Sequence, residues 1–128
     1  MSVRAILTPL GDDLFALHFD LINEGPEPID LPAYEPFLDF SVTARTGGNP
    51  VPVRQPALDI GLQATTIHVP AHGSAGLETP IRLRIAAGAE AGTDGFVWTV
   101  AHPLAGLSLR IEVGLPAPFA GSYELSPG

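Results

Sequence analysis

The fold is decided by one stretch, Leu14-Phe15-Ala16-Leu17-His18-Phe19-Asp20-Leu21-Ile22, in which large apolar side chains alternate with smaller or polar ones. Successive side chains of a β-strand point to opposite faces of the sheet, so this alternation predicts a strand with one buried face. The buried face carries Phe15, Leu17, Phe19 and Leu21. The sequence therefore predicts a sheet with a hydrophobic core on one side.

The same alternation recurs at residues 38–44, 81–85, 96–100 and 107–113, with shorter candidates at 3–8 and 66–69. Glycine, asparagine and proline stand between these runs, where they supply the backbone angles that turns require. Regularly spaced short strands with such turns are typical of a β-sandwich or a small barrel. We predict a single all-β domain over residues 1–128, an immunoglobulin-like antiparallel β-sandwich of about seven to nine strands, with a small barrel as the alternative.

We expect most of these runs to contribute buried residues to the core. We expect it to include Phe15, Leu17, Phe19, Phe40, Leu83, Trp98, Leu109 and Ile111. Phe96 falls on the same face of its run as Trp98, and Phe119 is large enough that we expect it to dock on the domain or on a neighbouring subunit. The proline-rich segments 26–36 and 50–56 are expected at sheet edges or crossovers, because proline lacks the N–H of a central strand.

Charge and composition exclude several classes of function. The chain has six Arg, no Lys and 14 acidic residues, which gives a net charge of −8. Nucleic acids and anionic membranes are bound chiefly through basic groups, so neither is expected as a partner. Without cysteine, no disulfide, thiol nucleophile or thiolate metal site can form. Only a short apolar stretch precedes Thr8-Pro9, so we expect no signal peptide and a cytoplasmic location.

No set of residues in the sequence predicts catalysis, a metal or a cofactor. His68 and His72 are four residues apart, but Pro70 between them argues against the helix that would bring both to one metal. We interpret them as a strand-end and a turn histidine, and His18 as a solvated or hydrogen-bonded residue on a polar strand face. Ser74 lacks the spacing of a nucleophile elbow. We therefore expect the chain not to be an enzyme.

The loop 48–56 is the most suggestive segment for binding. Three prolines hold it extended, and a pre-ordered loop loses less freedom when it binds. Its candidate partner-binding residues are Val53, Arg54 and Gln55. In this hypothesis the loop adds to a partner as a strand and Arg54 reaches an acidic pocket, while Pro56 hinders cleavage by a protease. The alternative is a paired edge strand with Arg54 in solvent.

Three stretches carry a likeness to a known family. Residues 19–31 form a strand, an asparagine turn and a second strand; residues 36–42 read Pro-Phe-Leu-Asp-Phe-Ser-Val and are followed by a glycine turn and valine at 48–53; and residues 68–74 form a strand with a Pro-Gly turn. Together they resemble bacterial intracellular proteinase inhibitors, which have a small immunoglobulin-like sandwich. The family's tryptophan-rich segment is replaced here by Val51-Pro52-Val53-Arg54. The resemblance implies the sandwich and, as an expectation, protease inhibition.

The sequence as a whole predicts a non-enzymatic β-sandwich that binds another protein, either as a protease-inhibitor-like module or as an accessory part of an assembly. Self-association into a homo-oligomer is a further possibility that the sequence leaves open. The alternative class is a module that binds carbohydrate or another small ligand through a concave sheet face. An exposed aromatic pair in a groove would favour that class, whereas a free edge strand or a flat apolar patch would favour a protein partner.

Overall fold

The computed structural model describes residues 2–11, 13–55, 61–88 and 96–126. Within these ranges the chain forms eleven strands and no helix, so the all-β prediction is confirmed, and no helix there is long and apolar enough to cross a membrane. The strands are β1 (Ser2–Pro9), β2 (Leu14–Asn23), β3 (Ile29–Glu35), β4 (Phe40–Thr46), β5 (Asn49–Val51), β6 (Val53–Arg54), β7 (Gln63–Val69), β8 (Gly73–Ile85), β9 (Val97–Val100), β10 (Leu107–Val113) and β11 (Gly121–Leu125).

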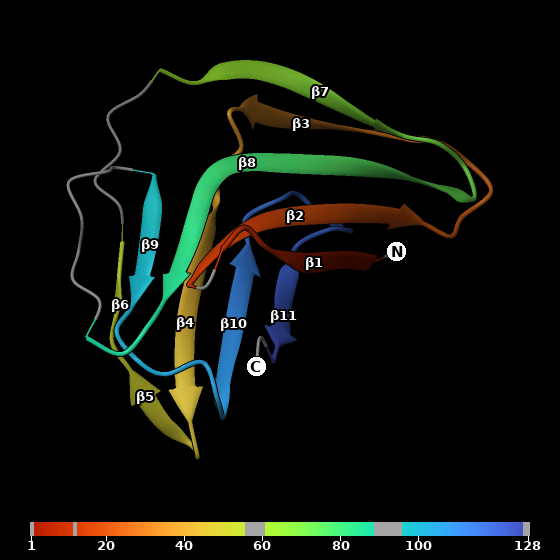
Figure 1. Cartoon of the computed structure of the whole chain (residues 1–128). Coiled ribbons are helices and arrows are strands. Elements are labelled where there is room, and N and C mark those ends of the chain that lie inside the picture. Colours follow the sequence, from red (N-terminus) through yellow and green to blue (C-terminus); the bar gives the residue numbers. More distant parts are fainter. Residues whose placement is uncertain (1, 12, 56–60, 89–95, 127–128) are drawn as a thin grey trace.

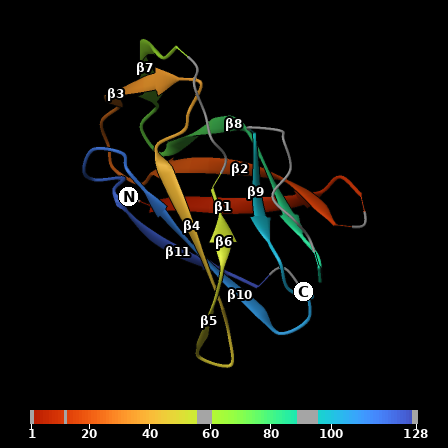
Figure 2. The ribbon, with the colours of Figure 1, turned by 90° about the vertical axis from the view of Figure 1, so that its left-hand side faces the viewer.

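The described strands form three sheets. A five-stranded sheet has the order β1-β2-β8-β9-β6, a four-stranded sheet the order β11-β10-β4-β5, and a third sheet pairs β3 with β7. The five-stranded sheet curls into half a barrel, and it is mixed because β8 and β9 run parallel. The β3–β7 ribbon arches above β8 and β2 (Figure 1). The turned view shows the four-stranded sheet crossing β1 and β2 at a steep angle (Figure 2).

The core fills the space that the three sheets enclose. All eight side chains predicted from the alternation are buried there, and Phe119 is buried with them, as expected for a docked C-terminal segment. Aromatic rings form its centre: the Phe19 ring lies 5.4 Å from that of Phe37 and 5.3 Å from that of Phe40. Phe40 in turn stacks on Trp98 at 6.5 Å. Aromatic pairs at such distances add to the free energy of burial.

The predicted strand number and the purely antiparallel pairing are wrong. β5 and β6 span only three and two residues, too few to show any periodicity. Pro32 lies inside β3 and Pro80 inside β8, where the pattern alone argues against a strand. The parallel pairing of β8 with β9 depends on the crossover between them, which alternation does not encode.

Phe96, which falls on the same face of its run as Trp98, is 37% exposed and differs in this from its buried neighbour. It stands directly before β9, whose first paired residue is Val97 opposite Arg82. Its carbonyl accepts a hydrogen bond from the Arg82 N–H at 2.7 Å, which ties the backbone of residue 96 to the sheet.

The two proline-rich segments lie where the sequence predicted. β3 belongs to the two-stranded ribbon, β5 is the edge of the four-stranded sheet, and β6 is the edge of the five-stranded sheet. The chain crosses from one sheet to the other at Pro52, between β5 and β6. Pro56, at the end of the second segment, lies outside the described residues.

Candidate functional site

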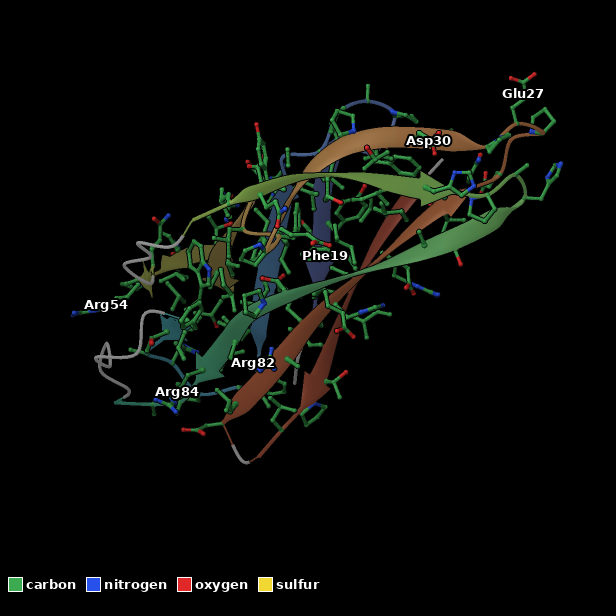
Figure 3. All side chains as sticks on the ribbon, turned by 90° about the horizontal axis from the view of Figure 1, so that it is seen from above. Phe19, Glu27, Asp30, Arg54, Arg82 and Arg84 are labelled. Carbon is green, nitrogen blue, oxygen red and sulfur yellow. The ribbon has the colours of Figure 1, made fainter. Side chains whose placement is uncertain are left out.

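The strands β7 and β8 follow each other through a tight turn but pair with different partners. At the turn, the Gly73 N–H donates to the Pro70 carbonyl at 3.1 Å, and His72 adopts a φ of 51°. Beyond it, β7 pairs with β3 and the first half of β8 pairs with β2. Among the described strands, the facing edges of β7 and β8 therefore have no ladder partner. Seen from above, the two ribbons diverge from the turn as a V (Figure 3).

A bend in β8 leaves the edge of its first half that faces β7 without a partner among the described strands. β9 pairs only with residues 82–85 of β8, after Pro80, which has no N–H to donate. The Thr79 hydroxyl accepts the Ile81 N–H at 3.3 Å, and the register with β2 shifts at the same level, between Ala16 and His18. Bulges of this kind bend a strand and end regular pairing. The exposed edge therefore follows from the bend that Thr79-Pro80 introduces into β8.

The space between the two edges is a groove of about 590 Å³, here called the splayed-strand groove. Phe37 lies against it from the core, and Tyr34 and Glu35 at the end of β3 flank it. From the two strands it is lined by Thr65, Thr66, Ile67, His68, Ala75, Gly76, Leu77 and Glu78. Unpaired backbone N–H and C=O groups on both sides make such a groove a template for an extended chain.

Histidine–carboxylate pairs mark both sides of the splayed-strand groove. His18 Nε2 lies 2.8 Å from the Asp20 carboxylate, and Gly76 leaves room for its ring, since a Cβ there would lie 3.1 Å from it. On the other side, His68 Nδ1 lies 2.5 Å from the Asp30 carboxylate. His18 is thus a hydrogen-bonded residue of strand β2, and His68 lies near the end of strand β7, as the sequence predicts. The groove lining itself contains two carboxylates, those of Glu35 and Glu78.

A second groove adjoins the splayed-strand groove and is mainly apolar. It measures about 610 Å³ and shares Tyr34, Phe37 and Thr65 with the splayed-strand groove. Its remaining lining residues are Pro32, Ala33, Leu38, Asp39, Leu62, Ala64, Gly114, Leu115 and Pro116. Tyr34 is 57% and Leu62 50% exposed, so this apolar groove continues onto the surface as an apolar patch.

The candidate residues from the sequence lie elsewhere. Val53 and Arg54 pair with Val100 and Thr99 as the edge strand β6, with Val53 half-buried and Arg54 exposed. Val53 and Gln55 line a separate pocket of about 490 Å³ beside Trp98. Arg54 lies at the opposite end of the molecule from Asp30 on the β3–β7 ribbon (Figure 3). Their partner-binding role stays a prediction.

The described residues contain no group of three His, Cys, Asp or Glu side chains placed to hold a metal ion. His72 stands in the β7–β8 turn, as its sequence context predicts, and His102 Nδ1 lies 2.7 Å from the Pro103 carbonyl. Neither histidine lines the splayed-strand groove or the apolar groove.

Sequence reasoning missed both grooves, although part of the signal was present. The turn at Pro70 and Gly73 predicted a strand on either side, but alternation says nothing about whether two such strands pair with each other. Thr65 and Thr66 are polar and Ala75 and Gly76 are small, so the alternation of large apolar side chains is weak in the strand segments that form the groove. Comparison of the chain with family models, with curated proteins and with solved structures finds no match.

Proposed function

We propose that this chain is a non-enzymatic protein-binding domain that takes an extended segment of a partner protein into the splayed-strand groove. The observation that carries the proposal is the pair of strand edges, on β7 and β8, that face each other across the groove and have no ladder partner among the described strands. A segment added there pairs with one edge or both through its backbone, which gives affinity, and its alternate side chains meet the lining, which gives selectivity.

The geometry suits a short strand. β7 spans seven residues, Gln63–Val69, and an extended chain rises about 3.3 Å per residue, so a segment of comparable length fits alongside it. The ribbon residues Leu31 and Val69 are buried against the core, so β7 is a supported edge. A preformed edge costs little ordering on binding.

A narrower version of the proposal follows the family resemblance. In it, the two large sheets correspond to an immunoglobulin-like sandwich, and the partner is a protease that the domain inhibits. An accessory role in a larger assembly uses the same groove with a partner that is not a protease. The two versions differ in whether the partner is a protease whose activity the domain inhibits.

The test starts from random 12-residue peptides selected for binding to the whole chain. Amide hydrogen exchange then locates the bound peptide, because unpaired edge amides exchange fast and become protected when a strand is added. We expect new protection at residues 65–68 and 74–78. Protection confined to another edge, such as β1, β5, β6 or β11, or a failure to select any binder, would contradict the proposal.

A variant pair makes the test specific. Ala75 is half-buried and lines the groove, whereas Ala105 is exposed in the loop before β10. Ala75→Trp is expected to fill the groove and abolish binding of the selected peptides, and Ala105→Trp to leave their Kd unchanged. Circular dichroism on both variants verifies that the β-structure is retained.

A carbohydrate ligand is a second candidate, and Tyr34 is the observation that favours it. Its exposed ring lies between the two grooves with Glu35, Thr65 and Thr66 nearby. Sugars stack on such rings, so a glycan array is expected to show ligands that Tyr34→Ala loses. An array without hits removes this candidate.

A further inference from the structure

Among the described residues that line the apolar groove, Asp39 alone carries a charge. Asp39 follows Leu38 just before β4, and its residue is exposed. Across the described residues its carboxylate has no ion pair and no hydrogen bond, although its backbone carbonyl accepts the Gly114 N–H at 2.8 Å. An unpaired carboxylate beside an apolar surface favours a cation with an apolar body.

The walls of the apolar groove fit the body of such a cation. Leu62, Leu115 and Pro116 supply aliphatic surface, and Tyr34 supplies an exposed aromatic ring. Lysine and arginine place their methylene stems along apolar surfaces of this kind and keep the charged head at a polar end. Aromatic rings add attraction for the same cations.

Charge complementarity points to the same ligand. The chain carries a net charge of −8, and none of its six arginines lines the apolar groove. The field of the protein therefore attracts a basic group to this surface, and the chain itself does not neutralise Asp39 there.

We propose that the apolar groove is the anchor site for a lysine or arginine side chain of the bound segment, with its cation at Asp39 and its stem on Leu62, Leu115 and Tyr34. The inference rests on the proposed function, because the apolar groove adjoins the splayed-strand groove through Tyr34, Phe37 and Thr65. A strand in the splayed-strand groove thus has a side-chain pocket at its flank, and the partner is a segment with a basic residue near one end.

Two small probes test the anchor site without a peptide. Hexylammonium carries the cation and the stem, and 1-hexanol carries the stem alone. Titration of the full chain is followed by amide chemical shifts, and we expect hexylammonium to shift Ala33, Ala64 and Leu115. Its affinity should exceed that of hexanol by about threefold to tenfold and should fall with added salt.

Asp39→Asn keeps the shape of the side chain and removes its charge. We expect this variant to bind hexylammonium and hexanol equally, while Glu124→Gln, on the exposed face of β11, behaves as the unmodified chain. Equal binding of the two probes to the unmodified chain, or an unchanged preference in Asp39→Asn, would overturn the proposal.

The selected peptides separate this inference from the proposed function. Peptides that protect β7 and β8 but show no preference for lysine or arginine leave the function standing and overturn the anchor. Binding of hexylammonium at Asp39 without any selected peptide supports the anchor as a cation site and overturns strand addition.

Discussion

The carboxylate of Asp39 occupies the space in which a side chain of residue 114 would begin. A Cβ built on Gly114 would lie 2.5 Å from Asp39 Cγ and 2.7 Å from Oδ2, closer than non-bonded atoms approach. The two residues are also joined by the hydrogen bond from the Gly114 N–H to the Asp39 carbonyl. Glycine at 114 therefore sets where the acidic group lies at the mouth of the apolar groove.

Gly114→Ala is expected to displace the Asp39 carboxylate while retaining its charge. Because the cation must meet that carboxylate, we expect the preference for hexylammonium over hexanol to fall by about threefold or more. Gly11→Ala is the matched control, since a Cβ at Gly11 meets nothing within 4 Å. An unchanged preference in Gly114→Ala, measured by the same chemical-shift titration, would show that the position of the carboxylate does not matter.

Asn23 ties the β2–β3 loop to the end of β7, and its removal is expected to destabilise the fold. The buried side chain donates to the Glu27 carbonyl at 2.7 Å and to the Val69 carbonyl at 3.4 Å, and it accepts the Gly25 N–H at 2.9 Å. Asn23→Ala leaves these groups unpaired, which should cost about 2 kcal/mol of unfolding free energy. Urea denaturation measures it, with exposed Asn49→Ala as control. A loss below 0.5 kcal/mol, the typical size of a surface effect, would refute this role.

The aromatic centre of the core should be the most sensitive region to truncation. Phe19 and Leu109 are fully buried, and replacing either with alanine is expected to lower the unfolding free energy by about 2–5 kcal/mol. Leu10→Ala, at an exposed position, should change it by less than about 0.5 kcal/mol. Similar midpoints in chemical denaturation for the three variants would mean that these residues do not form the core.

The C-terminal segment is expected to be an integral part of the fold. Phe119 is fully buried, and β11 extends the four-stranded sheet by pairing Tyr123 with Ile111. Deletion of residues 117–128 removes both contributions, and Phe119→Ala alone should cost about 3–5 kcal/mol. Thermal melting with the full chain as reference measures the loss. An unchanged melting temperature after deletion would show that the segment contributes nothing.

The features that could be predicted depend on local sequence, whereas those that were missed depend on contacts between residues far apart in the chain. Burial of Phe19, Leu109 and their counterparts follows from alternation, which is local, and so the core could be predicted. Partner choice is not local: whether β8 pairs with β7, β2 or β9 depends on the bend at Thr79-Pro80 and on contacts with distant strands. Asp39 and Gly114 likewise come together only through the fold, and neither stands out in the sequence.

The chain has two candidate surfaces for partner binding, the edge strand β6 with Arg54 and the splayed-strand groove. The sequence predicts Val53, Arg54 and Gln55 as partner-binding residues, whereas the proposal from the structure places the partner in the splayed-strand groove. Arg54 is an exposed residue of edge strand β6, opposite Thr99, so Arg54→Ala is expected to change the unfolding free energy by less than about 0.5 kcal/mol.

The decisive comparison measures Arg54→Ala and Ala75→Trp against the same selected peptides and against a panel of proteases. We expect Ala75→Trp to lose binding and Arg54→Ala to retain the Kd of the unmodified chain within about twofold, because Arg54 does not line the splayed-strand groove. The reverse result, with binding or inhibition lost in Arg54→Ala at an unchanged melting temperature, would make β6 the anchor and assign the partner to the segment that the sequence singled out. In that case the free edges of β7 and β8 would need another role, since an unpaired edge is a surface that natural proteins either use or protect.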